Sequence, residues 1–171
     1  MERYLKDYGW RSIKMSHQHA AAHFMYPLME FSERYGIVVV VYYGHNIPNN
    51  PYIVDIANSF PEVKLGILHM GGGTCFDLEL FSTKMAVKNN NIYLEMCYSN
   101  PVAIKQAVKA IGSEKVIYGS ESSNGGHRSR FEKAGNYIEL MLDSIRFAGI
   151  TKVQKDEVVG DSVENLLGID A

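Results

Sequence analysis

Histidines and carboxylates in this sequence follow short apolar runs, so the side chains that bind metals or move protons gather where those runs end. All six histidines lie in such segments: His17, His19, His23, His45, His69 and His127. Glu95 lies near the end of the fourth run, and Glu121 follows the fifth. Imidazoles and a carboxylate that converge are the ligand set suited to zinc or another divalent transition metal. Such a metal lowers the pKa of a bound water to about 7 and so creates a nucleophile.

Each of these side chains also has a structural interpretation. A histidine at the end of a strand often only hydrogen-bonds within a loop, which applies to His17, His19, His23 and His127. Glu121 comes directly after Gly119 and Ser120, so it is either a solvated loop residue or a carboxylate that meets a positive charge. Lys14 lies inside an apolar run and is either at a sheet edge or a buried charge that needs a partner.

Five short apolar runs recur about every 25 residues, which is the spacing of a strand, a helix and two short loops. They cover residues 11–15, 37–43, 64–70, 91–96 and 115–120. Their hydrophobicity is continuous rather than alternating, most clearly in IVVVVYY at 37–43, which indicates strands covered on both faces. The sequence therefore predicts parallel strands joined by helical crossovers.

The segments between the runs carry helix signals. Asn100 and Pro101 supply a cap and a first-turn proline before a helical pattern that ends at Gly112. Further helices are predicted over residues 26–36, 50–60, 136–149 and 151–169. Pro27 is expected near the start of the first of these helices. Strands that alternate with helices in this way predict an α/β fold with a parallel sheet.

Two closures of such a sheet fit this pattern: an open doubly wound sheet, or part of a (β/α)8 barrel. No G-x-G-x-x-G motif follows the first run, which disfavours a nucleotide-binding doubly wound fold. In either closure the loops at the carboxyl ends of the strands form the site. We therefore expect the histidines and glutamates that follow the runs to converge at one end of the sheet.

Composition limits the classes of partner and compartment. The 171 residues predict one domain over 1–171, with 46% hydrophobic and 21% charged residues. A net charge of −2 without basic runs argues against nucleic acid as a partner, and no apolar run is long enough to span a membrane. Cys75 and Cys97 are isolated, and the first ten residues lack a signal-peptide core, so we expect a cytoplasmic protein with reduced thiols.

Several stretches of the chain match the pattern of one known family. They are SIKM at 12–15, FPEVKLGILHMGGG at 60–73, NIYLEMCYS at 91–99, IGSEKVIYGSESS at 111–123 and GDSVENLLGI at 160–169. With these motifs the chain resembles the carboxy-terminal part of the amidohydrolase-related proteins, which are metal-dependent hydrolases and decarboxylases on a (β/α)8 barrel. The resemblance implies a partial barrel of about five parallel βα units that correspond to strands 4 to 8.

The resemblance also implies roles for particular residues. His69 stands at the sixth-strand histidine, a general base or electrophile near the metal. Glu121 takes the place of the eighth-strand aspartate, at the metal and base position, so both residues are predicted to be catalytic. Tyr42 stands where the fifth-strand ligand histidine is expected, and Lys14 stands at the fourth-strand lysine; both are predicted to bind substrate. The predicted metal ligands are His45, Glu121, His17 and His19. The expected cofactor is a divalent metal, with zinc the first choice.

Two functions follow as alternatives. The first is a metal-dependent hydrolase or decarboxylase that acts on a small carboxylated substrate or a cyclic amide or ester. The second is a non-catalytic remnant on the same partial barrel, which binds a small anion or a partner chain without a complete metal centre. Because a barrel of this type needs roughly 250 residues, five strands leave two open sheet edges. We expect a second copy or a partner chain to cover them.

Overall fold

The sheet at the centre of the molecule has five parallel strands in the order β1-β2-β3-β4-β5. The computed structural model of the chain describes residues 1–16, 22–42, 52–120 and 137–169. The strands are β1 (Ser12–Ser16), β2 (Val38–Tyr42), β3 (Leu65–Ile67), β4 (Ile92–Glu95) and β5 (Val116–Ile117). Neighbours in the sheet are also neighbours in the sequence, which confirms the predicted series of parallel βα units.

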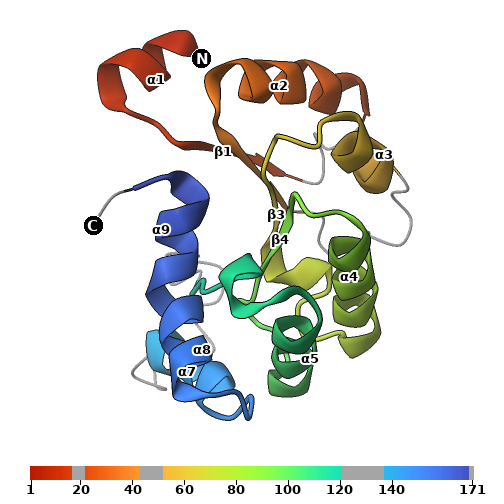
Figure 1. Cartoon of the computed structure of the whole chain (residues 1–171), viewed down its shortest axis with the longest axis vertical. Helices are drawn as coiled ribbons and strands as arrows, with labels where there is room; N and C mark the ends of the chain where they lie inside the picture. Colours follow the sequence, from red (N-terminus) through yellow and green to blue (C-terminus); the bar gives the residue numbers. More distant parts are fainter. Residues whose placement is uncertain (17–21, 43–51, 121–136, 170–171) are drawn as a thin grey trace.

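Helices connect the strands and cover the sheet (Figure 1). The α-helices are α1 (Glu2–Tyr8), α2 (Ala22–Tyr35), α3 (Tyr52–Ser59), α4 (Phe76–Lys88), α5 (Pro101–Ile111), α7 (Tyr137–Arg146), α8 (Lys152–Asp156) and α9 (Ser162–Leu167). Short 3-10 turns form η3 (Leu68–Gly71) and η4 (Ser113–Lys115), and a π-helical segment, η6 (Glu157–Asp161), joins α8 to α9. In Figure 1 the helices α4 and α5 lie on one side of the strands and α9 lies on the other.

The two faces of the sheet bury different sets of side chains. On the outer face, Val39, Val41, Ile67 and Leu94 belong to the large core that also contains apolar residues of α2, α3, α4 and α5. The alternate residues of the strands form the inner face, where Val38 and Ile117 pack with Leu166 of α9. The continuous hydrophobicity of the runs thus reflects burial on both faces, as predicted.

Helix α9 is fixed at the amino-terminal end of the sheet by a lysine. The Lys64 ammonium, one residue before β3, donates to the backbone carbonyls of Asn165 and Leu166 at 3.0 and 3.1 Å. These carbonyls lie in the last turn of α9, where a helix has no backbone donors of its own to offer. The carboxyl ends of the strands, where a site is expected, therefore lie at the opposite end from this contact.

Asn91 shapes the turn that leads from α3 into β3. Its buried side-chain amide donates to the carbonyls of Ala57, Phe60 and Val63 at 2.9–3.1 Å. One side chain thereby donates to carbonyl groups at the end of α3 and in the following turn, where the helical hydrogen-bond ladder has ended. This arrangement holds the start of β3 against β4, whose first residue follows Asn91.

The structure corrects the expected position of Pro27. Helix α2 begins at Ala22, so Pro27 is an interior residue rather than one near the helix start. Proline removes one helical hydrogen bond there. Met25, Leu28 and Met29 on the same helix are at most 5% exposed, and their burial against the sheet offsets that loss. At α5, in contrast, the prediction is confirmed: the Asn100 side chain accepts the N–H of Val102, and Pro101 is the first helical residue.

Within the part of the chain that the structure describes, no helix is long and apolar enough to cross a bilayer. Both cysteines are free thiols; Cys75 is exposed and Cys97 is buried. Cys97 follows β4 by two residues and lies beside the histidine at the end of β3, which is the region where the site was expected.

Candidate functional site

The backbone takes an unusual course at the carboxyl end of β3. Strand pairing stops at Ile67, and His69 and Met70 in η3 adopt left-handed conformations with φ of 55° and 46°. Tyr98, after β4, also has a positive φ of 62°. Such conformations are uncommon for residues other than glycine and cluster at functional sites. Strain at two adjacent strand ends therefore marks this end of the sheet as the candidate site.

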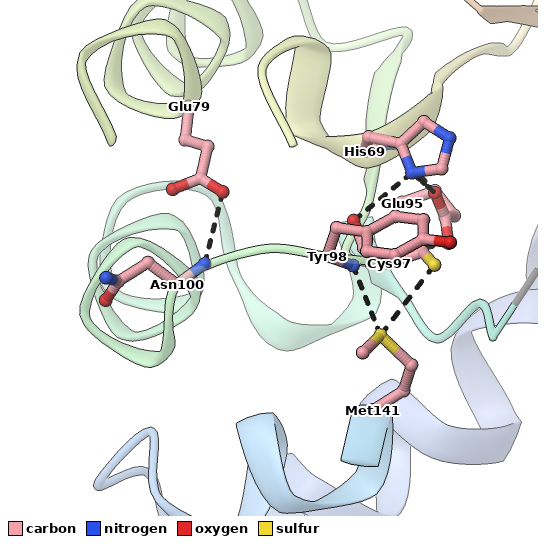
Figure 2. A network of polar contacts seen from close by, with 7 residues as sticks. All are labelled: His69, Glu79, Glu95, Cys97, Tyr98, Asn100 and Met141. Carbon is pink, nitrogen blue, oxygen red and sulfur yellow. Dashed lines mark hydrogen bonds and ion pairs between the residues drawn. The ribbon is translucent and has the colours of Figure 1, made fainter. Parts of the chain in front are cut away.

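Glu95, the last residue of β4, holds the β3 end in place (Figure 2). Its carboxylate accepts the backbone N–H of His69 at 2.8 Å and the backbone N–H of Cys97 at 3.0 Å. Two charge-assisted bonds stabilise this carboxylate, which is 8% exposed. Gly119, just after β5, completes the contact, because a Cβ there would lie 1.7 Å from Glu95 Oε1. The Glu95 side chain thus contacts residues that follow β3, β4 and β5.

The His69 imidazole is buried and its orientation is fixed. The residue is 7% exposed, and Nδ1 lies 3.3 Å from the Cys97 carbonyl oxygen and 4.0 Å from Glu95 Oε2. A carbonyl oxygen only accepts, so this contact requires the proton on Nδ1 and places the lone pair of the neutral ring on Nε2. A histidine held in this tautomer offers Nε2 as a base or a metal ligand.

Aromatic rings surround this imidazole. The rings of Tyr42, at the end of β2, and of Tyr98 each lie 5.2 Å from the His69 ring, centroid to centroid. Helix α7 is attached to the same region through Met141, whose sulfur accepts the Tyr98 N–H at 3.2 Å and lies 3.8 Å from the Cys97 sulfur (Figure 2). The site therefore draws on β2, β3, β4 and α7.

A second buried carboxyl group lies nearby, on α4. Glu79 is 0% exposed, and its Oε1 accepts the N–H of Asn100, the cap of α5, at 3.1 Å (Figure 2). Burial raises the pKa of Glu79 to about 7, while the Asn100 N–H and the Ser99 hydroxyl oppose the shift. This group sits at the start of a helix and stabilises its N-terminal dipole when ionised.

The structure describes three of the predicted site residues, His69, Tyr42 and Lys14, and not the others. The structure brings His69 and Tyr42 together. Lys14 is exposed on β1, in register with Val40 of β2. His45, Glu121, His17 and His19 lie outside the described residues. Among the residues that are described, no group of three histidine, cysteine, aspartate or glutamate side chains could hold a metal ion.

Two functional candidates were not assigned a role by the sequence. Glu95 was recognised only as a residue at the end of the fourth run, and Tyr98 was not singled out. A carboxylate directly after an apolar strand signals a buried group that needs donors, and that signal points to Glu95. No comparable local signal marks Tyr98, because its contact with His69 depends on the left-handed turn after β4.

Comparison with known proteins gives a family and a fold. A family model described as amidohydrolase matches residues 1–125. A search of curated proteins finds no match to the sequence. Solved structures with the same fold include TIM-barrel proteins, and the chain spans 58–60% of the length of the first of them. These likenesses confirm the predicted partial (β/α)8 barrel.

Three solved structures illustrate the range of proteins that share this fold. The 4-oxalomesaconate hydratase of Rhodopseudomonas palustris is 16% identical, with a TM-score of 0.65, over 98% of this chain and 58% of that one. An amidohydrolase of Burkholderia multivorans with bound zinc is 10% identical, with a TM-score of 0.68, over 99% and 70%. A 2,6-dihydroxybenzoate decarboxylase in complex with 2,6-dihydroxybenzoate is 10% identical, with a TM-score of 0.67, over 99% and 66%. At these identities the likeness shows the fold alone.

Proposed function

Because the chain belongs to the amidohydrolase family, we propose that it serves metal-dependent hydrolysis or decarboxylation of a small carboxylated substrate or a cyclic amide or ester. The observation that carries this proposal is the buried His69 ring, which is held with its Nδ1 proton on the Cys97 carbonyl. In that state Nε2 has the lone pair needed to accept a proton. A histidine with a fixed tautomer at the carboxyl end of a strand is suited to general acid–base work.

The proposed metal is zinc, which the Burkholderia multivorans amidohydrolase contains. Its ligands would be His45, Glu121, His17 and His19, since imidazole and carboxylate are the donors that zinc prefers. When bound, the metal supplies an activated water or polarises a substrate oxygen. His69 accepts or returns the proton, and Glu95 keeps its backbone in place through the bond to the His69 N–H.

Substrate binding is assigned to Tyr42 and Lys14. The Tyr42 ring lies edge-on to the His69 ring and forms an apolar wall beside it. Lys14 offers an ammonium group to a substrate carboxylate. The small carboxylated ligand of the 2,6-dihydroxybenzoate decarboxylase supports this substrate class.

The free thiols support a cytoplasmic location, and the single domain over 1–171 stays a prediction.

The second candidate function is binding without catalysis. It is supported by the rings of Tyr42 and Tyr98, which each lie 5.2 Å from the His69 ring and offer contacts to a bound molecule without a metal. In this case the strand ends around His69 bind a small anion or a partner chain. The two candidates differ in one property, the capacity to retain a metal.

Metal content and turnover distinguish the two candidates. We expect near-stoichiometric zinc or manganese after purification without chelator, and turnover of some member of a panel of hydroxybenzoates, cyclic amides and lactones. His69→Gln should lower that turnover about 100-fold or more, because it removes the proton acceptor. His23→Gln, at an exposed position on α2, is the matched control and should change nothing. A chain without metal or turnover would support the binding function instead.

A further inference from the structure

One peptide group at the candidate site is hydrogen-bonded on both of its sides. It joins Cys97 to Tyr98, shortly after β4. Its carbonyl oxygen lies 3.3 Å from Nδ1 of His69, and its N–H donates to the Met141 sulfur at 3.2 Å (Figure 2). The peptide is trans and planar, so its carbonyl and its N–H point in opposite directions. One orientation of this plane therefore serves both contacts.

The turn that contains this peptide is held by further backbone contacts. Before the peptide, the Glu95 carboxylate accepts the Cys97 N–H at 3.0 Å. After it, Tyr98 has a φ of 62°, and its carbonyl accepts the N–H of Thr74 at 3.1 Å. A residue other than glycine keeps such a conformation only where the surrounding contacts enforce it. Met141 supplies the contact to the N–H at the centre of this turn.

The sulfur of Met141 distinguishes this residue from a purely apolar one. Met141 is 4% exposed on α7 and lies 43 residues from Tyr98 in the chain. Its burial accounts for an apolar side chain, but leucine would fill a similar volume without accepting a hydrogen bond. The sulfur lies within reach of two donors, the Tyr98 N–H and, at 3.8 Å, the Cys97 thiol. The acceptor, rather than the volume, is therefore the property that this position uses.

The carbonyl on the other side of this peptide determines which ring nitrogen of His69 carries the proton. It can only accept, so it requires the proton on Nδ1. Hydrogen bonds on the two sides of one peptide polarise it in the same sense, so the contact to sulfur strengthens the carbonyl as an acceptor. The Glu95 carboxylate cannot replace it in this position, because Oε2 lies 4.0 Å from Nδ1, beyond hydrogen-bond distance. A rotation of the peptide plane would therefore release the Nδ1 proton.

We propose that Met141 is a positioning residue for His69: its sulfur orients the Cys97–Tyr98 peptide, whose carbonyl keeps the proton on Nδ1 and the lone pair on Nε2. Helix α7 thereby sets the protonation pattern of an imidazole at the end of β3. The orientation of the peptide and the tautomer of the ring are properties of the folded chain and need neither metal nor substrate. The effect on turnover rests on the proposed function of His69.

Nitrogen-15 spectra of the histidine rings test the proposal, because they distinguish a neutral ring protonated on Nδ1 from one protonated on Nε2. In the wild-type chain we expect the neutral His69 ring to carry its proton on Nδ1. Met141→Leu removes the acceptor at a similar volume, so the population protonated on Nε2 and the exchange rate of the Tyr98 amide should each rise about tenfold. Met141→Gln offers an amide oxygen to the same N–H and should restore both.

Met85→Leu is the matched control, because this methionine on α4 is 5% exposed and the exchange removes a sulfur from the core in the same way. It should leave the His69 tautomer unchanged. A wild-type ring protonated on Nε2, an unchanged tautomer in Met141→Leu, or an equal change in Met85→Leu would each overturn the proposal.

Turnover separates this inference from the proposed function. With a substrate that the wild-type chain converts, Met141→Leu should lower kcat about tenfold and leave KM nearly unchanged, because the altered tautomer affects proton transfer rather than binding. An unchanged kcat with an altered tautomer would overturn the role of Met141 in the reaction. A wild-type chain without turnover, in which Met141→Leu still alters the tautomer, would contradict the proposed function and support the positioning of His69.

Discussion

At the scale of single residues, one carboxylate organises the candidate site. Glu95 accepts backbone N–H groups from His69 and from Cys97, and it fills the space beside Gly119. The sequence predicted that His69 would stand at a strand end, because an apolar run stops there. It did not predict the left-handed backbone at His69, whose N–H is bound to a side chain 26 residues away. Contacts of that range leave no local pattern.

Substituting Gly119 tests this arrangement at the residue scale. In Gly119→Ala the new Cβ would lie 1.7 Å from Glu95 Oε1, so the carboxylate must move and release its donors. We expect a loss of about 1–3 kcal/mol in the free energy of unfolding, measured by denaturant titration. Faster exchange of the His69 amide should accompany it.

Gly160→Ala is the control for this substitution. A Cβ at Gly160 meets nothing within 4 Å, and the residue lies in a helical segment. Alanine there should be neutral or stabilise the chain by up to about 1 kcal/mol. If both alanine variants unfold at the same denaturant concentration, Gly119 does not confine Glu95 as described.

At the scale of elements, the strands followed from the sequence better than the helices did. Continuous apolar runs located all five strands, but β3 and β5 are shorter than their runs. The 3-10 turn η3 takes up the end of the third run, and strand pairing of β5 stops at Ile117. Helix α4 was expected only from the spacing of the runs, because buried polar residues such as Glu79 and Ser82 weaken its own apolar pattern. Helix α1 buries none of its residues, so it offered no apolar stripe to recognise.

Glu79 should make stability depend on pH through the contact between α4 and α5. The pKa of Glu79 is about 7 in the folded chain, against 4.5 for an unperturbed glutamate. Between pH 4.5 and pH 7 the carboxyl group is therefore protonated in the folded state and ionised in the unfolded state. The contribution of Glu79 to the free energy of unfolding should therefore be highest below pH 4.5. It should fall by up to about 3 kcal/mol as the pH rises to 7.

Glu79→Gln isolates that contribution. Glutamine keeps an oxygen for the Asn100 N–H but does not titrate, so the difference in unfolding free energy between wild type and variant should change between pH 4.5 and 7. Glu164→Gln, at an exposed position on α9, should show no such change. A constant difference across this range for Glu79→Gln would mean that the buried carboxyl does not couple folding to pH.

At the scale of the whole molecule, the chain is a partial (β/α)8 barrel of the amidohydrolase family. The family and the five-unit sheet could be predicted, because the motifs at 60–73 and 111–123 and the regular spacing of the runs are properties of the sequence. The position of α9 on the inner face could not be predicted. It results from the contact of Leu166 with Val38 and Ile117, three residues far apart in the chain.

Manganese relaxation can show whether His69 faces a divalent metal at the carboxyl ends of the strands. In the chain labelled with nitrogen-15 in its histidine rings, paramagnetic Mn²⁺ broadens only the signals of nearby rings. We predict that one equivalent of Mn²⁺ broadens the His69 ring signals, and that one equivalent of diamagnetic Zn²⁺ leaves them sharp. Sharp His69 signals in the presence of bound Mn²⁺ would contradict the proposed site.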